Sequence, residues 1–409
     1  MISFSEARAH ILSLVTPTPV VRVPLSRVAG YALAHPVPAS TPIPRFDASA
    51  MDGFGVHATD LAGASPDAPV RLRVLATVRA GDRPHTDPIP AGCAVKILTG
   101  APVPTAIDAV VVREVCEETD GDVLVARAVT PGVNIRRAGE EFQPGDVVLP
   151  AGKRMTPPVI GLLATLGIHT VSVHRKPSIA LVVTGSELVR PGRHLRTGQI
   201  YDANSFTITA ALRELSLPAP ARFFVKDDPV TLDNTLARAF QQAEVILVAG
   251  GVSVGDYDYV RGSCEAQGVI SQVWQIAIKP AKPTYFGTLD SPDGRKLIFG
   301  LPGNPVSALL AFQLFVRPAL LQMLGVQDTE PLMVTAELTT ALRKRSGRHE
   351  FVRGVVAEHA GRLIVTPVTG QDSHMLGGLA QANCLIHFPV ADDYLPADTP
   401  VCVELLNWA

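Results

Sequence analysis

Five acidic residues of this sequence stand at or shortly after the ends of apolar runs that we expect to be strands. They are Glu187, Asp227, Asp228, Asp256 and Asp258. Mg²⁺ prefers hard oxygen ligands and shares them with substrate phosphates, so clustered carboxylates beside a phosphate site suit this cation. The pattern predicts a cation site made by Glu187, Asp227 and Asp258. A solvated acidic rim would look the same in the sequence, and Asp227-Asp228-Pro229 also fits a plain helix cap, so both interpretations stay open here.

Glycine-rich turns follow three of the apolar runs: VVTGSEL (182–188), VAGGVSVGDYDYV (248–260) and FGLPGNPVSA (299–308). Glycine lets backbone N–H groups approach a ligand closely, and a helix N-terminus offers further free N–H groups to an anion. In the third turn Asn304 is a candidate N-cap, and Pro305 suits the first helical position. One such turn is ordinary in an α/β protein, but three together with acids favour a phosphate-bearing ligand.

Two lysines stand in the proline-stiffened segment AIKPAKPTYFG (277–287). Lys279 and Lys282 would be presented there with little loss of chain entropy. Ammonium groups held in this way suit a tetrahedral oxyanion or a phosphate. Two solvated lysines on a loop are an equally good interpretation of this segment alone.

The segment 251–255 also matches G-x-S-x-G, the nucleophile elbow of α/β-hydrolases, with Ser253 as the nucleophile. An elbow must lead into a helix, and the following DYDYVRG makes a poor first helical turn. The histidines that could complete a triad lie in the β-rich last part of the chain. A serine hydrolase is therefore a minor alternative.

Strands and helices must bring these residues together. Between about residues 175 and 326, near-continuous apolar runs alternate with helical periods, which is typical of a parallel sheet covered by helices on both faces. Ligands bind such sheets outside the carboxyl ends of the strands. Residues 70–150 and those after about 330 show short β-type runs separated by turns. The predicted fold class is α/β plus β, in a multidomain chain.

Composition narrows the function classes. The 409 residues suffice for two to four domains, and 36 Lys and Arg against 38 Asp and Glu give a net charge of −2, which offers nucleic acid no electrostatic footprint. The five cysteines are far apart and include no C-x-x-C pair, so we expect a reducing compartment, the cytoplasm.

Two apolar segments bear on the membrane. The N-terminus carries Glu6, Arg8 and His10 where a signal peptide would be apolar, and it predicts an amphipathic helix that begins with a capping box of Ser3 and Glu6. The stretch 308–326 is interrupted by polar residues and proline, which favours a buried helix over a membrane span. We therefore expect no membrane partner.

Nine motifs follow one another along nearly the whole chain. They are SAMDGFGV (49–56), KILTGAPVP (96–104), NIRRAGEEF (134–142), VVTGSEL (182–188), GQIYDAN (198–204), GGVSVGDYDYV (250–260), IKPAKP (278–283), GLPGNPVSA (300–308) and GQDSHMLGGLAQANCLI (370–386). Together they resemble the molybdopterin molybdenumtransferase family, which includes bacterial MoeA and the E domain of gephyrin. Several long motifs in one order are far more specific than any single one.

The resemblance implies an elongated homodimer with four domains in each chain. These are a central α/β domain that binds molybdopterin and phosphate (1–25 and 175–327), a linking domain (26–44 and 146–174), a small inserted β domain that contributes to the partner subunit's cleft (45–145), and a C-terminal β-barrel-like domain (328–409). The family inserts molybdenum from molybdate into adenylylated molybdopterin, with Mg²⁺ as cofactor, and releases AMP. A separate molybdopterin adenylyltransferase is the implied donor.

The resemblance also implies site residues. Asp52, Glu187, Asp227 and Asp258 would be catalytic, and the last three would hold the metal. The residues implied for substrate binding are Thr99, Glu141, Gly250, Gly251, Ser253, Lys279, Lys282, Pro302, Pro305, Ser307, Arg348, Arg353 and Ser373. The sequence departs from the family pattern at Gln275, where a lysine is frequent, so one cation is missing from the expected set. A non-catalytic scaffold of the same fold is the main alternative.

Overall fold

The computed structural model describes residues 1–252, 259–345, 347–406 and 408. The chain packs as two compact units. Unit 1 comprises Met1–His35, Ala151–Ile160 and His169–Ala409, and unit 2 comprises Pro36–Pro150 and Gly161–Ile168. The four domain ranges expected from the resemblance remain predictions.

The centre of unit 1 is a six-stranded sheet in the order β16-β13-β17-β21-β20-β18. Neighbours among the first four strands are parallel, as the sequence predicts, whereas β20 and β18 are antiparallel additions at one edge. The strands are β16 (Ala221–Val225), β13 (Ile179–Thr184), β17 (Val245–Ala249), β21 (Gly294–Leu301), β20 (Tyr285–Ser291) and β18 (Ile270–Trp274).

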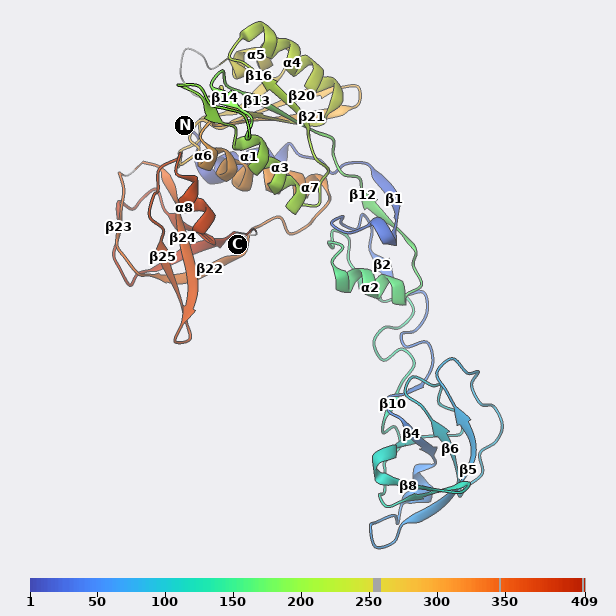
Figure 1. Cartoon of the computed structure of the whole chain (residues 1–409). Helices are drawn as coiled ribbons and strands as arrows, with labels where there is room; N and C mark the ends of the chain where they lie inside the picture. The colour runs from blue at the N-terminus through green and yellow to red at the C-terminus, as the bar shows by residue number, and fades with distance from the viewer. Residues whose placement is uncertain (253–258, 346, 407, 409) are drawn as a thin grey trace. The chain divides into compact units, whose positions relative to one another are not determined.

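Alternate residues of the buried strands enter two different cores. In β13, Leu181 and Val183 belong to one core, and Ala180 and Val182 to the other, because side chains of a strand point to its two faces in turn. Figure 1 shows α4 (Pro229–Gln242) and α5 (Val260–Ala266) over one face of the sheet. The opposite face carries α1 (Phe4–Ser13), α3 (Asn204–Glu214), α6 (Pro305–Ala311) and α7 (Arg317–Met323).

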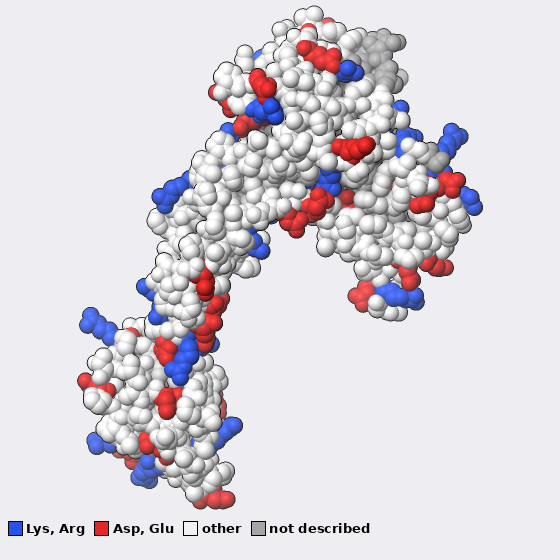
Figure 2. All heavy atoms as spheres, turned by 180° about the vertical axis from the view of Figure 1, so that it is seen from behind, with Lys and Arg blue, Asp and Glu red and all other residues white. Residues whose placement is uncertain are grey.

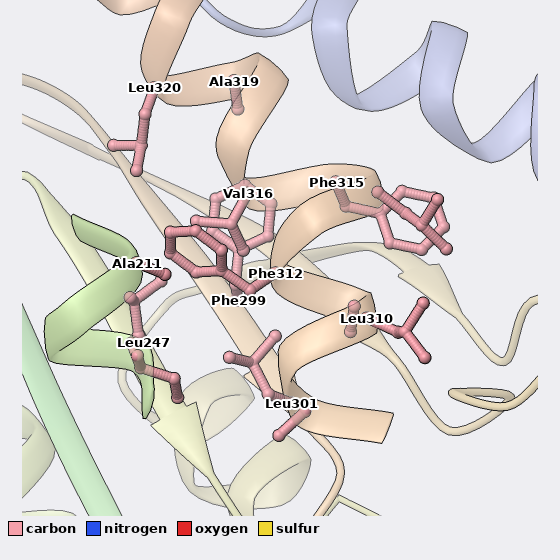
Figure 3. Packing of buried hydrophobic residues seen from close by; sticks show 14 of the residues in the cluster. Ala211, Leu247, Phe299, Leu301, Leu310, Phe312, Phe315, Val316, Ala319 and Leu320 are labelled. Carbon is pink, nitrogen blue, oxygen red and sulfur yellow. The ribbon is translucent and has the colours of Figure 1, made fainter. Parts of the chain in front are cut away.

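The helix α6 runs through a π-helical segment, η4 (Phe312–Val316), into α7. The combined helix Pro305–Met323 is long and apolar enough to cross a membrane, yet 83% of its most apolar window is buried inside the protein. Figure 3 shows Phe312 of this helix beside Phe299 of β21, and Leu310 of the same helix belongs to the same buried cluster. The prediction of a buried core helix is confirmed, and so is the capping box of Ser3 and Glu6 before α1.

The last part of unit 1 is a small β barrel. Its strands are β22 (Met333–Leu338), β24 (His349–His359), β25 (Arg362–Pro367), β26 (Cys384–Phe388) and β28 (Pro400–Leu405). The order β24-β25-β22-β28-β26 closes because β26 also pairs with β24. The strand β19 (Ile278–Lys279) comes from the α/β part of the chain but pairs with β24. The barrel region also contains α8 (Leu376–Gln381) and the pair β23 (Leu342–Arg343) and β27 (Tyr394–Leu395).

Unit 2 contains a six-stranded sheet in the order β7-β4-β6-β5-β9-β8. Val110 and Val111 of β7 enter different cores, so both faces of this sheet are covered. The strands are β7 (Ala109–Val112), β4 (Gly53–Val56), β6 (Cys93–Ile97), β5 (Val70–Val78), β9 (Asp122–Val125) and β8 (Cys116–Thr119). This confirms the predicted inserted β region.

The remaining elements include short ladders, an α-helix and the 3₁₀ helices η1 (Leu25–Arg27), η2 (Ala58–Leu61) and η3 (Arg113–Val115). The ladders are β1 (Val20–Pro24) with β12 (Thr170–His174), β2 (Val37–Pro38) with β11 (Val147–Leu149), β3 (Ala48–Ser49) with β10 (Ile135–Arg136), and β14 (Leu188–Val189) with β15 (Ile200–Tyr201). The helix is α2 (Pro157–Thr165). All five cysteines are free. Acidic and basic side chains are interspersed over the face seen in Figure 2, as the balanced composition predicts.

Candidate active site

The carboxyl ends of β13, β17 and β21 meet at one edge of the central sheet. Gly250 follows β17 with a φ of 98°, and a Cβ atom there would lie 2.6 Å from the Thr184 carbonyl oxygen at the end of β13. The position therefore requires glycine for its conformation and for the close contact. Gly251 follows with a φ of 64°. The three glycine-rich turns do lie side by side, as the sequence predicts.

A cavity of about 510 Å³ opens at this edge, and we call it the wide cavity. Buried polar atoms face it without a partner among the described residues: Thr184 Oγ1 and Asn204 Oδ1, on side chains that are 8% and 7% exposed. Buried polar groups are rarely left unpaired in the absence of a ligand or water. The residues that line the wide cavity are Thr184, Glu187, Leu188, Ile200, Tyr201, Asp202, Ala203, Asn204, Gly251, Val252, Pro283, Pro302, Gly303, Asn304, Pro305 and His374.

Two of the predicted carboxylates stand at this edge. Glu187 is exposed and lines the wide cavity, and its carboxylate lies 2.8 Å from where a Cβ of Gly185 would be. Asp227 follows the neighbouring strand β16, and its Oδ2 accepts a hydrogen bond of 2.9 Å from the Ser186 N–H. The Ser186 hydroxyl in turn accepts a bond from the Asp227 N–H, at 3.1 Å. Ser186 thus ties the two strand ends together.

Asp228 is a helix cap. Its carboxylate accepts a hydrogen bond of 2.8 Å from the Thr231 N–H at the start of α4. Hydrogen bonds from Thr231 lower the pKa of the Asp228 carboxyl. Of the two interpretations left open for Asp227-Asp228, the cap therefore applies to Asp228. Asp256, Asp258 and Ser253 lie outside the described residues, and among the described residues no group of three or more potential metal ligands occurs.

A second cavity, of about 270 Å³, shares Pro283, Pro302 and Asn304 with the wide cavity. We call it the lysine cavity. It unites predicted residues from four separate segments, and among the described residues Asp372 is the one acid in its lining. Its lining residues are Ile278, Lys279, Pro280, Ala281, Lys282, Pro283, Pro302, Asn304, Ser307, Arg348, Gln371, Asp372 and Ser373. Three cations against one carboxylate favour an anionic ligand.

The cations of the lysine cavity differ in their partners. The Lys279 ammonium is 3.3 Å from a carboxylate oxygen of Glu350. Neither the Lys282 ammonium nor the Arg348 guanidinium has an ion-pair or side-chain hydrogen-bond partner among the described residues. Ser373 is fixed by Asn304, whose side-chain amide donates to the Ser373 hydroxyl at 2.9 Å. Within the part of the chain that the structure describes, the cavity thus presents two cations without an ion-pair partner.

Arg353 does not line either cavity. Its side chain is 1% exposed, and its guanidinium donates to the carbonyl oxygens of Gly370 and Asp372 and to Gln371 Oε1. Burial lowers the pKa of this guanidinium. Gln371, Asp372 and Ser373 line the lysine cavity, so Arg353 supports the loop that forms part of its wall.

In unit 2 the predicted residues Asp52 and Thr99 are in direct contact. Asp52 Oδ1 accepts hydrogen bonds of 2.7 Å from both the N–H and the hydroxyl of Thr99. These two bonds lower the pKa of the Asp52 carboxyl. Glu141 is exposed, and its backbone N–H donates to the Ile43 carbonyl at 3.0 Å. The carboxylate of its neighbour Glu140 accepts a hydrogen bond from the Arg137 N–H.

Models of three protein regions match the chain in sequence order. The MoeA N-terminal region (domain I and II) matches residues 2–167, a probable molybdopterin binding domain matches 180–322, and the MoeA C-terminal region (domain IV) matches 335–406. The molybdopterin molybdenumtransferase of Haemophilus influenzae is 34% identical over 100% of this chain and 99% of its own length. The chain belongs to the molybdopterin molybdenumtransferase family.

Further relatives agree. Molybdopterin molybdenumtransferase 2 of Mycobacterium tuberculosis is 36% identical over 95% of this chain and 96% of its own length. Two crystal structures of the MoeA molybdopterin biosynthesis protein of Pyrococcus horikoshii superpose with TM-scores of 0.82 and 0.78, at 27% and 30% identity. Each comparison covers 99% of this chain and at least 99% of the other. The family and the mixed α/β and β fold expected from the sequence are confirmed.

Some residues of this family member's site were not predicted. Asp202, Asn204 and His374 line the wide cavity. Asp202 is 3% exposed, and its carboxylate accepts hydrogen bonds from both the N–H and the hydroxyl of Ser205 at the start of α3. The motifs GQIYDAN and GQDSHMLGG contained these residues, so the signal was present. Gln275, which replaces the frequent lysine, lines neither cavity and has a φ of 60°.

Proposed function

We propose that this chain inserts molybdenum from molybdate into adenylylated molybdopterin and releases AMP. Membership of the molybdopterin molybdenumtransferase family over the full length supports the reaction class. The observation that carries the proposal is the pair of adjoining cavities, one rich in cations and the other lined by the carboxylates of Glu187 and Asp202 and by polar atoms that have no partner among the described residues. A scaffold role and a serine hydrolase are not favoured by these relatives.

The lysine cavity suits molybdate, the substrate that carries the metal. Lys279, Lys282 and Arg348 would attract a tetrahedral dianion, and the hydroxyls of Ser307 and Ser373 would donate hydrogen bonds to its oxygens. Pro302 and Asn304 belong to both cavities, so an oxyanion in one would lie beside a pterin substrate in the other. This arrangement brings the two substrates together before reaction.

The wide cavity suits the phosphate-bearing pterin. Thr184 Oγ1 and Asn204 Oδ1 offer hydrogen bonds to polar edges of a ligand, and Gly250 and Gly251 allow a close approach to the backbone. Glu187 and Asp227, with Asp258, would hold Mg²⁺, because one carboxylate oxygen of Asp227 accepts no hydrogen bond from the described residues and Glu187 is exposed. When bound, the cation would neutralise phosphate charge as AMP leaves.

The remaining parts of the proposal concern the assembly and its setting. We propose that the chain acts as a homodimer in the cytoplasm and that Asp52 and Thr99 serve the cleft of a partner subunit. A separate molybdopterin adenylyltransferase would supply the substrate. The five free cysteines support a reducing compartment.

AMP release from adenylylated molybdopterin, with Mg²⁺ and with or without molybdate, tests the reaction. We expect release that depends on molybdate and falls by about 100-fold in Glu187→Gln and in Lys279→Gln, since each removes a charge that stabilises reacting groups. Glu358→Gln and Lys153→Gln change exposed residues elsewhere in unit 1 and serve as matched controls. The proposal would be contradicted if the rate of AMP release did not depend on molybdate, or if the control variants lowered this rate as much as the site variants.

A further inference from the structure

Glu350 is a carboxylate that the sequence motifs did not single out, and it lies directly behind the lysine cavity. It does not line the cavity, and its side chain is 12% exposed, against 52% for Lys279. The register of the parallel pair β19 and β24 places Lys279 opposite Glu350, so the backbone itself sets the two side chains side by side. Their charged atoms are 3.3 Å apart.

Among the described residues, Lys279 is the only cation that forms an ion pair with Glu350. The other nearby lysine, Lys344, gives its ammonium to the backbone carbonyls of Arg348, Phe388 and Pro389. A largely buried carboxylate needs a cation within reach, because its own solvation by water is reduced. Among the described residues Lys279 is thus the cation within ion-pair distance of Glu350, Lys344 adds an electrostatic attraction to the same carboxylate, and Lys279 also lines the cavity.

We propose that Glu350 is an internal counter-anion of Lys279, and that an oxyanion entering the lysine cavity competes with it for the ammonium group. Oxyanion binding is then an exchange of ion-pair partner. The exposed ammonium can turn toward the cavity, whereas the buried carboxylate stays in the barrel. This lowers the affinity of the cavity for its dianion below what three cations would give, and it makes Glu350 a positioning residue for Lys279. The inference rests on the proposed function only in taking an oxyanion as the ligand of this cavity.

The experiment is calorimetric titration of the full-length chain with sodium molybdate, and separately with sodium sulfate, in a low-salt buffer without other dianions. Glu350→Gln keeps the size and an acceptor oxygen but removes the charge. We expect it to bind either dianion about 3- to 30-fold more tightly, because the competing charge within ion-pair distance is gone. Lys279→Gln should bind about 10-fold or more weakly.

The double variant Lys279→Gln with Glu350→Gln separates partner exchange from a general effect of charge. If Glu350 acts through Lys279, removing Glu350 in the Lys279→Gln background will change the affinity by less than about 2-fold. Glu358→Gln removes an exposed charge from the same strand, β24, and should leave the affinity unchanged. Thermal unfolding of each variant shows whether it is folded.

The outcomes are distinct. Tighter binding in Glu350→Gln that disappears in the double variant supports the inference. An unchanged affinity in folded Glu350→Gln, or an equal gain in Glu358→Gln, overturns it and leaves the proposed function intact. If the wild-type chain binds neither dianion, the assignment of the lysine cavity fails and the inference fails with it.

Discussion

Replacing Arg353 tests whether this residue supports the wall of the lysine cavity or contacts the substrate. Arg353→Met keeps a long apolar stem but removes the guanidinium. Its shortest bond, to the Gly370 carbonyl, is 2.8 Å, and the three others to Asp372 and Gln371 are 3.3 Å. A hydrogen bond from a charged donor contributes about 1.5–3 kcal/mol, and longer bonds contribute less. We therefore expect a loss of about 3–5 kcal/mol in the stability of the C-terminal barrel.

Two measurements locate the effect. Hydrogen exchange of the backbone amides in residues 368–376 should become markedly faster, because the carbonyl groups of this loop lose their charged donor. Molybdate affinity should fall along with it, since Gln371, Asp372 and Ser373 line the cavity. Arg353→Lys should lie between, because an ammonium cannot reproduce the fork of the guanidinium. Arg362→Met is the control, because Arg362 makes an exposed ion pair with Glu337 that is worth at most about 1 kcal/mol.

One result would refute this reasoning. If Arg353→Met keeps the wild-type stability and the wild-type exchange rates in residues 368–376 but loses molybdate binding, Arg353 acts on the substrate directly. The buried position and the bonds to the loop would then have no part in its role.

Three further predictions concern other parts of the chain. Thr99→Val removes one of the two bonds that lower the pKa of Asp52, so a carbon-detected NMR titration should show the pKa of that carboxyl moving up toward its ordinary value, and no movement would contradict the described pair. Gly250→Ala should lower the free energy of unfolding, measured with denaturant, by at least about 2 kcal/mol, because φ is positive there and the added Cβ would meet the Thr184 carbonyl. The control Gly262→Ala lies in α5 with open space around it, so it should be neutral or raise the free energy of unfolding by up to about 1 kcal/mol. Burial lowers the pKa of His349 from 6.5 to about 4. Between these pH values the unfolded chain binds a proton that the folded chain does not, so the stability should fall as the pH falls through this window. His349→Gln should flatten that part of a plot of the unfolding midpoint against pH.

Local patterns predicted much of the fold. The strands β13 and β17 are apolar along their whole length because both faces are covered, and this gave the parallel α/β region directly. Because the carboxyl ends of parallel strands meet at one edge of a sheet, this assignment also placed Glu187, Asp227 and the glycine-rich turns at one edge. The antiparallel strands β20 and β18 were not predicted, because their alternation is weaker and nothing local shows which strand they join.

Long-range contacts account for what the sequence did not reveal. Glu350 and Arg353 differ by three positions, yet one supports a lysine and the other a loop, and only the register of β24 against its neighbours decides this. Asp227 and Asp228 are adjacent, yet one bonds to Ser186 and the other caps α4. Side-chain direction in a turn depends on the partner strand, which no local pattern specifies.

The pairing of β19 with β24 has a consequence for how the chain is made. Lys279 and Glu350 are 71 positions apart, and the cavity wall also needs Ser373. During synthesis, the α/β strands up to β21 can emerge and fold while half of the oxyanion cavity does not yet exist. A nascent or truncated chain would therefore have no completed site at which to sequester molybdate. Once the barrel has docked, a ligand that binds only the complete cavity stabilises that docked state by mass action, so the concentration of oxyanion should influence the lifetime of the mature chain.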